Sequence, residues 1–233
     1  MVLPLFFSDV CATSDTLTLD ADASRHVGQV LRMKEGELLQ LTDGKGNIVT
    51  SSIISPDKHA CSVSVIKREK VLPAAGKVSM AVSLLKHPAR FEWFLEKATE
   101  LGVQEIFPLK CARTEKQQFR QERWNNILLS AMLQSRQAWL PQLHEPLELK
   151  EIISSSRQTH KFIAHCMEGK KETLPVGSNA DVIILIGPEG DFTEEEVRLA
   201  ESQGFRAVSL GSNRLRTETA AMTSAVLLCA GRG

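Results

Sequence analysis

The stretch Asp181-Val-Ile-Ile-Leu-Ile-Gly-Pro-Glu-Gly-Asp191 decides the fold that this sequence predicts. Its apolar run, residues 182–186, has the length and composition of a strand that is buried on both faces. A glycine-rich loop follows, then a short helix, a strand and a second loop, Leu210–Ala221. Ligands of open α/β sheets bind outside the carboxyl ends of parallel strands, so we expect both loops to line one ligand pocket.

The helix after the first loop has a strongly specified start. Thr193 and Glu196 have the spacing of a capping box, and Phe192 and Val197 that of a hydrophobic staple. The alternative, a plain strand-to-helix connection, has about equal weight on pattern alone, because a single glycine-rich turn is a weak signal. Neither loop contains G-x-G-x-x-G, so the fingerprint of a classical dinucleotide site is absent.

Upstream of this stretch, strand and helix patterns alternate. Apolar stripes predict helices over 90–101 and 121–138. Strands are expected at 78–85, 104–109, 162–165, 182–186 and 207–210. This alternation predicts an α/β fold, a mostly parallel sheet with helices on both faces.

The first 71 residues follow a different pattern. Short strands are predicted at 3–7, 16–19, 37–42, 47–54 and 60–67, with one helix over 23–33. Such an arrangement is typical of a small β-barrel. Leu72-Pro-Ala-Ala-Gly76 marks the change of pattern, which divides the chain into domains at 1–71 and 72–233.

The composition limits the kinds of function and cellular location that we expect for this protein. The formal net charge is zero and 42% of the residues are hydrophobic, which is typical of a globular protein without an overall nucleic-acid-binding charge. The five cysteines form no C-x-x-C pair, and the histidines lack metal-ligand spacing, so we expect no metal site and a reducing, cytoplasmic location. No apolar run reaches the length of a membrane span.

The region from residue 86 to 136 is richer in basic than in acidic residues. A solvated helix face is the favoured explanation of such a pattern on charge alone. The functional alternative is an edge that contacts RNA phosphates, with Lys86, Arg90, Lys97 and Arg113 as candidates.

Several short motifs occur in a fixed order along the chain. They are His26-Val-Gly-Gln-Val-Leu-Arg32, Lys97-Ala-Thr-Glu-Leu-Gly-Val103, Gln134-Ser-Arg136, Ile186-Gly-Pro-Glu-Gly190, Leu210-Gly211 and Leu215-Arg-Thr-Glu-Thr-Ala220. In these motifs the chain resembles the RsmE family of ribosomal RNA methyltransferases, within the SPOUT superfamily. The resemblance implies a PUA-like barrel and a SPOUT domain with a C-terminal trefoil knot. It also implies a homodimer that transfers methyl from S-adenosyl-L-methionine to N3 of a uridine in 16S ribosomal RNA of the small subunit.

The same resemblance implies roles for single residues. Those of the cofactor loops are Gly187, Glu189, Gly190, Leu210, Gly211, Leu215, Thr219 and Ala220. His26 and Arg32 join the four basic candidates above as RNA-binding residues. The chain departs from the family pattern at Asp191, where many relatives have glycine, and at Arg214, where the basic residue is displaced by one position.

Three residues are candidates for catalysis. A uridine N3 becomes nucleophilic when it loses its proton, and Arg216 would stabilise the charge that spreads onto the uracil oxygens. Glu218 would orient Arg216 or accept the proton, and Arg136 would come from the partner subunit or from the RNA-binding edge. Two alternatives stay open: a SPOUT enzyme with a ribose 2′-oxygen or guanine nitrogen as target, and a non-catalytic ribosome assembly factor.

Overall fold

The computed structural model describes residues 2–115, 118–177 and 179–231, and it separates into two compact units. The N-terminal unit comprises Met1–Pro73 together with Met132–Leu140, and the C-terminal unit comprises Ala74–Ala131 and Pro141–Gly233. The predicted domain division at residues 71 and 72 did not include the segment 132–140, which groups with the first unit.

The N-terminal unit is built on a curled five-stranded sheet. The strand order is β1 (Leu5–Phe7), β3 (Leu38–Thr42), β4 (Asn47–Ser55), β5 (Ser62–Lys70) and β2 (Thr16–Thr18). β1 pairs with β3 in parallel, and the other pairs are antiparallel. The core consists of alternate strand residues and a few from the connections, among them Phe6, Leu17, Leu39, Leu41, Val49, Ile53 and Val63.

The helix expected over 23–33 is shorter and of two kinds. α1 covers Ala21–Arg25, with Asp20 as its N-cap, and a π-helix, η1, covers His26–Val30. The change comes from a wider turn, in which the N–H of Leu31 donates to the carbonyl of His26 at 2.9 Å. The left-handed backbone of Arg32, with φ of 52°, then ends the helical segment.

The C-terminal unit contains an eight-stranded sheet in which every pairing is parallel. The order is β11 (Glu172–Thr173), β13 (Arg206–Ser209), β10 (His160–Ala164), β12 (Val182–Ile186), β6 (Val78–Ser83), β7 (Glu105–Lys110) and β8 (Gln142–Leu143), and β9 (Leu147–Glu148) also pairs with β7. β12 and β6 are buried along their whole length, as their continuous apolar runs predict.

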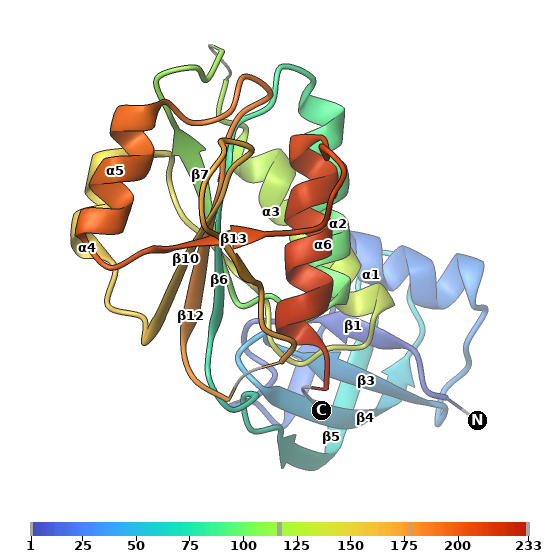
Figure 1. Cartoon of the computed structure of the whole chain (residues 1–233). Coiled ribbons are helices and arrows are strands. Elements are labelled where there is room, and N and C mark those ends of the chain that lie inside the picture. The colour runs from blue at the N-terminus through green and yellow to red at the C-terminus, as the bar shows by residue number, and fades with distance from the viewer. Residues whose placement is uncertain (1, 116–117, 178, 232–233) are drawn as a thin grey trace. The chain divides into compact units, whose positions relative to one another are not determined.

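Helices cover both faces of this sheet (Figure 1). α4 (Leu149–Ser155) and α5 (Glu194–Ser202) lie on one face, and α2 (Pro88–Glu100), α3 (Gln121–Gln134) and α6 (Thr217–Cys229) lie on the other. The first pair packs on Ile163, Ile183 and Leu185 of the sheet. The α/β architecture is therefore as predicted, with α4 as a helix that the sequence patterns did not reveal.

The prediction that α3 continues to residue 138 is wrong. The helix ends at Gln134, and Arg136 has a left-handed φ of 59° that no helix continues. The chain then pairs with the β3–β4 turn, since the N–H of Gly46 donates to Ala138 O at 2.8 Å and the N–H of Leu140 donates to Gly44 O at 2.8 Å. The apolar spacing that continues from the end of α3 to Ala138 thus reflects burial in the first unit instead of a longer helix.

Among the helices that the structure describes, none is both long and apolar enough to cross a membrane.

Candidate functional site

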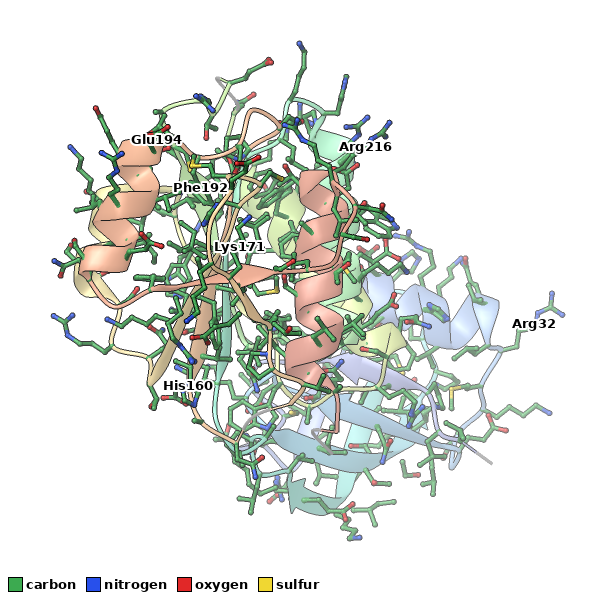
Figure 2. The ribbon with its side chains drawn as sticks, viewed as in Figure 1. Arg32, His160, Lys171, Phe192, Glu194 and Arg216 are labelled. Carbon is green, nitrogen blue, oxygen red and sulfur yellow. The ribbon has the colours of Figure 1, made fainter. Side chains whose placement is uncertain are left out.

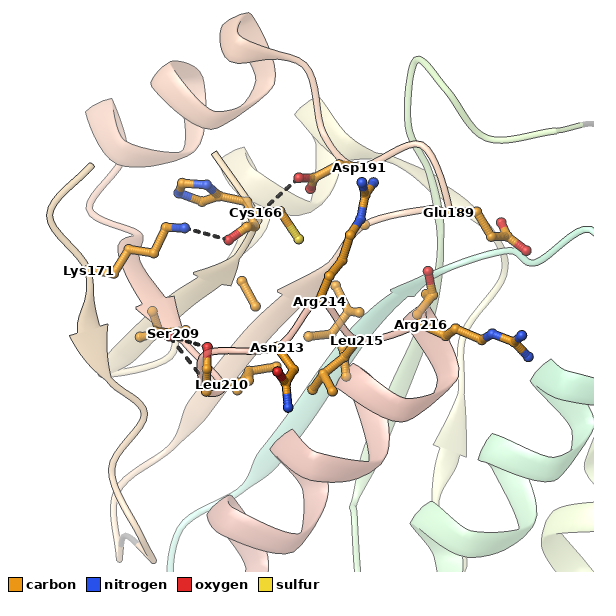
Figure 3. Close-up of a pocket in the computed structure, with 18 of the residues that line it drawn as sticks. Cys166, Lys171, Glu189, Asp191, Ser209, Leu210, Asn213, Arg214, Leu215 and Arg216 are labelled. Carbon is orange, nitrogen blue, oxygen red and sulfur yellow. Dashed lines mark hydrogen bonds between the residues drawn. The ribbon is translucent and has the colours of Figure 1, made fainter. Parts of the chain in front are cut away.

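A pocket of about 660 Å³ opens at the carboxyl ends of three neighbouring strands (Figure 3). β10 lies between β12 and β13 in the sheet, so the loops that follow these three strands meet. The lining residues are Ala164–Cys166 and Lys171 after β10, Ile186–Glu189 and Asp191 after β12, and Val208–Thr217 with Ala220 after β13. The two loops that the sequence placed at one sheet edge therefore do line one pocket.

The backbone of the first loop favours glycine at its start. A Cβ on Gly187 would lie 3.0 Å from the buried ring of Phe192, which is closer than side chains normally pack. The N–H of Asp191 closes the turn by donating to Pro188 O at 2.9 Å, and Asp191 itself has a left-handed φ of 64°. The loop is therefore compact, and its backbone is held close to Phe192.

The capping box predicted for α5 is present. The hydroxyl of Thr193 accepts from the N–H of Glu196 at 3.2 Å, and Glu196 Oε2 accepts from the N–H of Thr193 at 2.7 Å. Glu196 Oε1 also accepts from the N–H of Ala112 at 2.7 Å. One glutamate thus fixes the helix start and joins it to the loop after β7.

Arg113, which we predicted to bind RNA, supports the first loop in this structure. Its guanidinium donates to Gly190 O at 2.7 Å and to Phe192 O at 3.4 Å. A Cβ on Gly190 would lie only 3.3 Å from the Arg113 side chain. Glycine at this position lets the arginine approach the loop.

The third wall, after β10, was missed by the sequence analysis. Asp191 Oδ2 accepts from the N–H of Cys166 at 2.8 Å, and Lys171 Nζ donates to His165 O at 2.8 Å. Burial, together with the charge of Lys171, lowers the pKa of His165 and favours its neutral form, against the opposing charges of Asp191 and Glu201. The sequence offered no signal for this wall because strand order in the sheet does not follow chain order.

The predicted cofactor residues are mostly at the pocket. Those that line it are Gly187, Glu189, Leu210, Gly211, Leu215 and Ala220. Gly190 and Thr219 are not lining residues, but each is adjacent in the chain to one that is.

The three catalytic candidates lie in different surroundings. Arg216 lines the pocket and is the N-cap residue of α6, and its side chain points away from the pocket centre (Figure 3). Glu218 Oε1 lies 3.6 Å from Arg90 Nε, whereas its Oε2 is buried with no hydrogen-bond partner among the described residues. In the N-terminal unit, Arg136 donates to Leu3 O at 2.7 Å and to Gln40 Oε1 at 2.9 Å. The structure thus pairs Glu218 with Arg90, and no contact supports the expected orientation of Arg216 by Glu218.

The other RNA-binding candidates divide into exposed and paired residues. His26 and Arg32 are exposed on the N-terminal unit, and Arg32 extends away from the ribbon (Figure 2). Lys86 Nζ lies 3.4 Å from a Glu115 carboxylate oxygen. Lys97 contacts both Glu96, at 2.7 Å, and Glu100, at 2.8 Å. These pairs reduce the positive charge that Lys86 and Lys97 offer to a phosphate.

The part of the chain that the structure describes has no group of three or more His, Cys, Asp or Glu side chains placed to hold a metal ion, and its five cysteines are free.

Comparison with known proteins agrees with this architecture. The family described as RNA methyltransferase domain matches residues 73–228, and the one described as RNA methyltransferase PUA domain matches residues 19–66. Over 226 residues the chain is 30% identical to ribosomal RNA small subunit methyltransferase E of Bacillus subtilis, a match that covers 88% of this chain and 86% of the relative. The chain belongs to the ribosomal RNA small subunit methyltransferase E family.

Solved structures of similar proteins extend the family match to the whole fold. A probable rRNA-methyltransferase from Porphyromonas gingivalis is 36% identical, with a TM-score of 0.88 over 96% of this chain and 95% of that one. A ribosomal RNA small subunit methyltransferase E from Neisseria gonorrhoeae, solved bound to S-adenosyl methionine, is 28% identical, with a TM-score of 0.83 over 96% of this chain and 95% of that one. The family fold, with its PUA domain and SPOUT-type parallel sheet, is therefore the fold of this chain.

Proposed function

We propose that this protein is an S-adenosyl-L-methionine-dependent methyltransferase that methylates N3 of a uridine in 16S ribosomal RNA of the small subunit. The observation that supports this most is the pocket at the ends of β10, β12 and β13. It occurs in a chain whose family includes an enzyme solved with S-adenosyl methionine bound.

The pocket suits this cofactor in size and chemistry. Small-ligand pockets usually measure roughly 300–1,000 Å³, and this one measures about 660 Å³. Ala164, Ile186, Leu210 and Leu215 supply apolar surface for an adenine ring. Charged side chains at the lining, among them those of Lys171, Glu189 and Arg214, suit the charged amino-acid part.

The bound cofactor would supply the methyl group, so the protein has to position the uridine and stabilise charge. Arg216 is exposed at the pocket and has no charged partner in the described part of the chain. We propose that its guanidinium stabilises the negative charge that develops on the uracil oxygens when N3 loses its proton.

The contact between Glu218 and Arg90 changes the role that we propose for Glu218. Since it faces Arg90, we propose that it orients Arg90 toward the RNA instead of orienting Arg216. Its Oε2 is buried and has no hydrogen-bond partner among the described residues, so it is also suited to accept the N3 proton. Buried polar atoms without partners are rare in proteins, and a catalytic role is one explanation for them. We keep Arg136 as a group at the RNA-binding edge or supplied by a partner subunit.

The remaining parts of the proposal concern the whole protein. We propose residues 1–71 as an RNA-binding domain, with His26 and Arg32 on its surface, and residues 72–233 as the methyltransferase domain with a C-terminal trefoil knot. We further propose that the protein works as a homodimer in the cytoplasm, where ribosomal subunits are assembled.

One experiment tests the proposed reaction. Purified protein is incubated with methyl-labelled S-adenosyl-L-methionine and small ribosomal subunits that lack the modification, and the labelled nucleoside is identified by mass spectrometry. We expect 3-methyluridine. A 2′-O-methylated nucleoside or a methylguanosine would refute the N3 assignment, and a protein that neither binds the cofactor nor transfers methyl would favour the assembly-factor alternative.

A further inference from the structure

The carboxylate of Asp191 is held in one orientation on the pocket wall. Its Oδ1 accepts from the N–H of Phe192 and its Oδ2 from the N–H of Cys166, both at 2.8 Å. The backbone has a left-handed φ of 64°, which residues with a Cβ adopt rarely and aspartate tolerates better than most. Both the main chain and the side chain of this residue are thus fixed.

The bond to Cys166 joins two walls of the pocket. Asp191 belongs to the loop after β12, whereas Cys166 belongs to the segment after β10 that also carries Lys171 (Figure 3). The position of that segment therefore depends on the Asp191 side chain.

Of the two acidic side chains that line the pocket, Asp191 is the less exposed to water. Glu189, the other acidic lining residue, is exposed, whereas Asp191 is half-buried, so water screens its charge less. A carboxylate has about four acceptor positions, and the two backbone N–H groups occupy two of them. Among the described residues, neither Lys171, which donates to His165 O, nor Arg214, which is exposed, forms an ion pair with this carboxylate.

We propose that Asp191 is a specificity-determining residue that favours the positively charged sulfonium of S-adenosyl-L-methionine over the neutral thioether of the demethylated product. The proposal rests on the proposed function, and it gives this residue a role in releasing the product. A fixed anion at the pocket wall stabilises a cationic ligand without having to reorganise, and it offers no such gain to a neutral thioether.

Binding to the full-length protein tests this by calorimetry. S-adenosyl-L-methionine and S-adenosyl-L-homocysteine are titrated into the wild type, Asp191→Asn and Asp191→Gly. Glu195→Gln serves as the control, because it removes one exposed negative charge outside the pocket lining. We expect the preference for the charged ligand to fall by roughly five- to tenfold in both Asp191 variants and to stay unchanged in the control.

The two variants separate charge from shape. Asp191→Asn has a single acceptor oxygen and can keep only one of the two backbone hydrogen bonds, whereas Asp191→Gly removes both and should weaken both ligands further. Glycine suits the left-handed backbone, so that variant should fold. If both variants bind the two ligands with the wild-type ratio of affinities, Asp191 is purely structural and the proposal is overturned. A wild-type protein that binds neither ligand would instead refute the proposed function, and this inference with it.

Discussion

Arg216 is the residue on which the proposed chemistry depends most. It lines the pocket and precedes the first turn of α6, where the helix dipole adds to its positive charge. We expect Arg216→Ala to reduce methyl transfer by roughly a hundredfold or more, as does the loss of other groups that stabilise developing charge, while cofactor affinity changes little. Single-turnover transfer to small subunits, measured beside cofactor binding, checks this.

Arg198→Ala is the matched control, because Arg198 is an exposed arginine on α5 that pairs with Glu194. It should transfer methyl at the wild-type rate. If Arg216→Ala also kept that rate, the assignment of Arg216 would be wrong.

Arg113 supports the first loop from outside the pocket, through two backbone carbonyls. Arg113→Ala should weaken cofactor binding by roughly tenfold, or about 1.4 kcal/mol, because the hydrogen bonds it removes hold the loop and only part of their stabilisation reaches the ligand. Calorimetry with S-adenosyl-L-methionine measures the effect. Arg120→Ala removes an exposed arginine of the same segment and should leave the affinity unchanged; an equal loss in both variants would indicate a general charge effect instead.

The sequence predicted which residues line the pocket better than it predicted the contacts of single side chains. The glycines and apolar residues of the two loops were identified from the resemblance, and most of them line the pocket. The contacts of Arg113, Glu218 and Asp191 were not predictable, because each joins residues that are distant in the chain.

The start of α5 shows how a short element fixes the pocket. Its capping box stabilises the first turn, and Phe192 and Val197 belong to the same core cluster. Thr193→Ala should lower the free energy of unfolding by about 1 kcal/mol and increase amide hydrogen exchange at residues 194–197. Thr193→Ser, which keeps the cap hydroxyl, should restore both; failure to do so would mean that the threonine methyl group, and not the cap, stabilises the helix start.

Helix and strand patterns were reliable where periodicity reflects one environment. α2, α5 and the central strands occur where the sequence placed them, within a few residues. α3 was overestimated because apolar spacing continues past Gln134 into a segment that is buried for another reason. Periodicity reports burial, and it does not by itself report which element is buried.

The C-terminal unit has a polar network at the sheet edge opposite the pocket. Glu105 of β7 accepts from Ser79 Oγ at 2.7 Å and Lys77 Nζ at 3.2 Å, and the imidazole of His144 lies 3.7 Å away. His144, Ser79 and Lys77 together lower the pKa of Glu105 from 4.5 to about 2, against the opposing effect of burial. The distance of 3.7 Å exceeds hydrogen-bond length, so His144 lowers this pKa less than a hydrogen-bonded imidazole would. We therefore expect the Glu105 carboxylate to contribute about 2 kcal/mol to the free energy of unfolding.

This network gives the molecule a predictable response to acid. The folded-state pKa is depressed, so the stabilisation is fully present above pH 4.5 and is lost as the pH falls toward 2. Glu105→Gln should therefore be less stable than the wild type at pH 7, and the difference should shrink between pH 4.5 and 2. Urea unfolding at several pH values measures it. Glu172→Gln, which breaks the exposed pair with Arg206, should differ by less than about 0.5 kcal/mol at any pH.

For the whole molecule, the sequence predicted an α/β sheet after a small β unit, but not the order of the strands. The position of β10 between β12 and β13 creates the third wall of the pocket, and it follows from how the chain crosses the sheet. Local patterns carry no record of such crossings.

Residues 138–140 form hydrogen bonds with the β3–β4 turn, and these bonds affect when the N-terminal unit can finish folding during protein synthesis. The N-terminal unit lacks these partners until a further stretch of the second unit has been made. At roughly 5–20 residues per second, the ribosome needs several seconds between residue 73 and residue 140. The nascent β-sheet therefore lacks its contacts at Gly44 and Gly46 while β6, α2, β7 and α3 are translated, so the unit made first is completed only after residues 74–131 of its neighbour have been made.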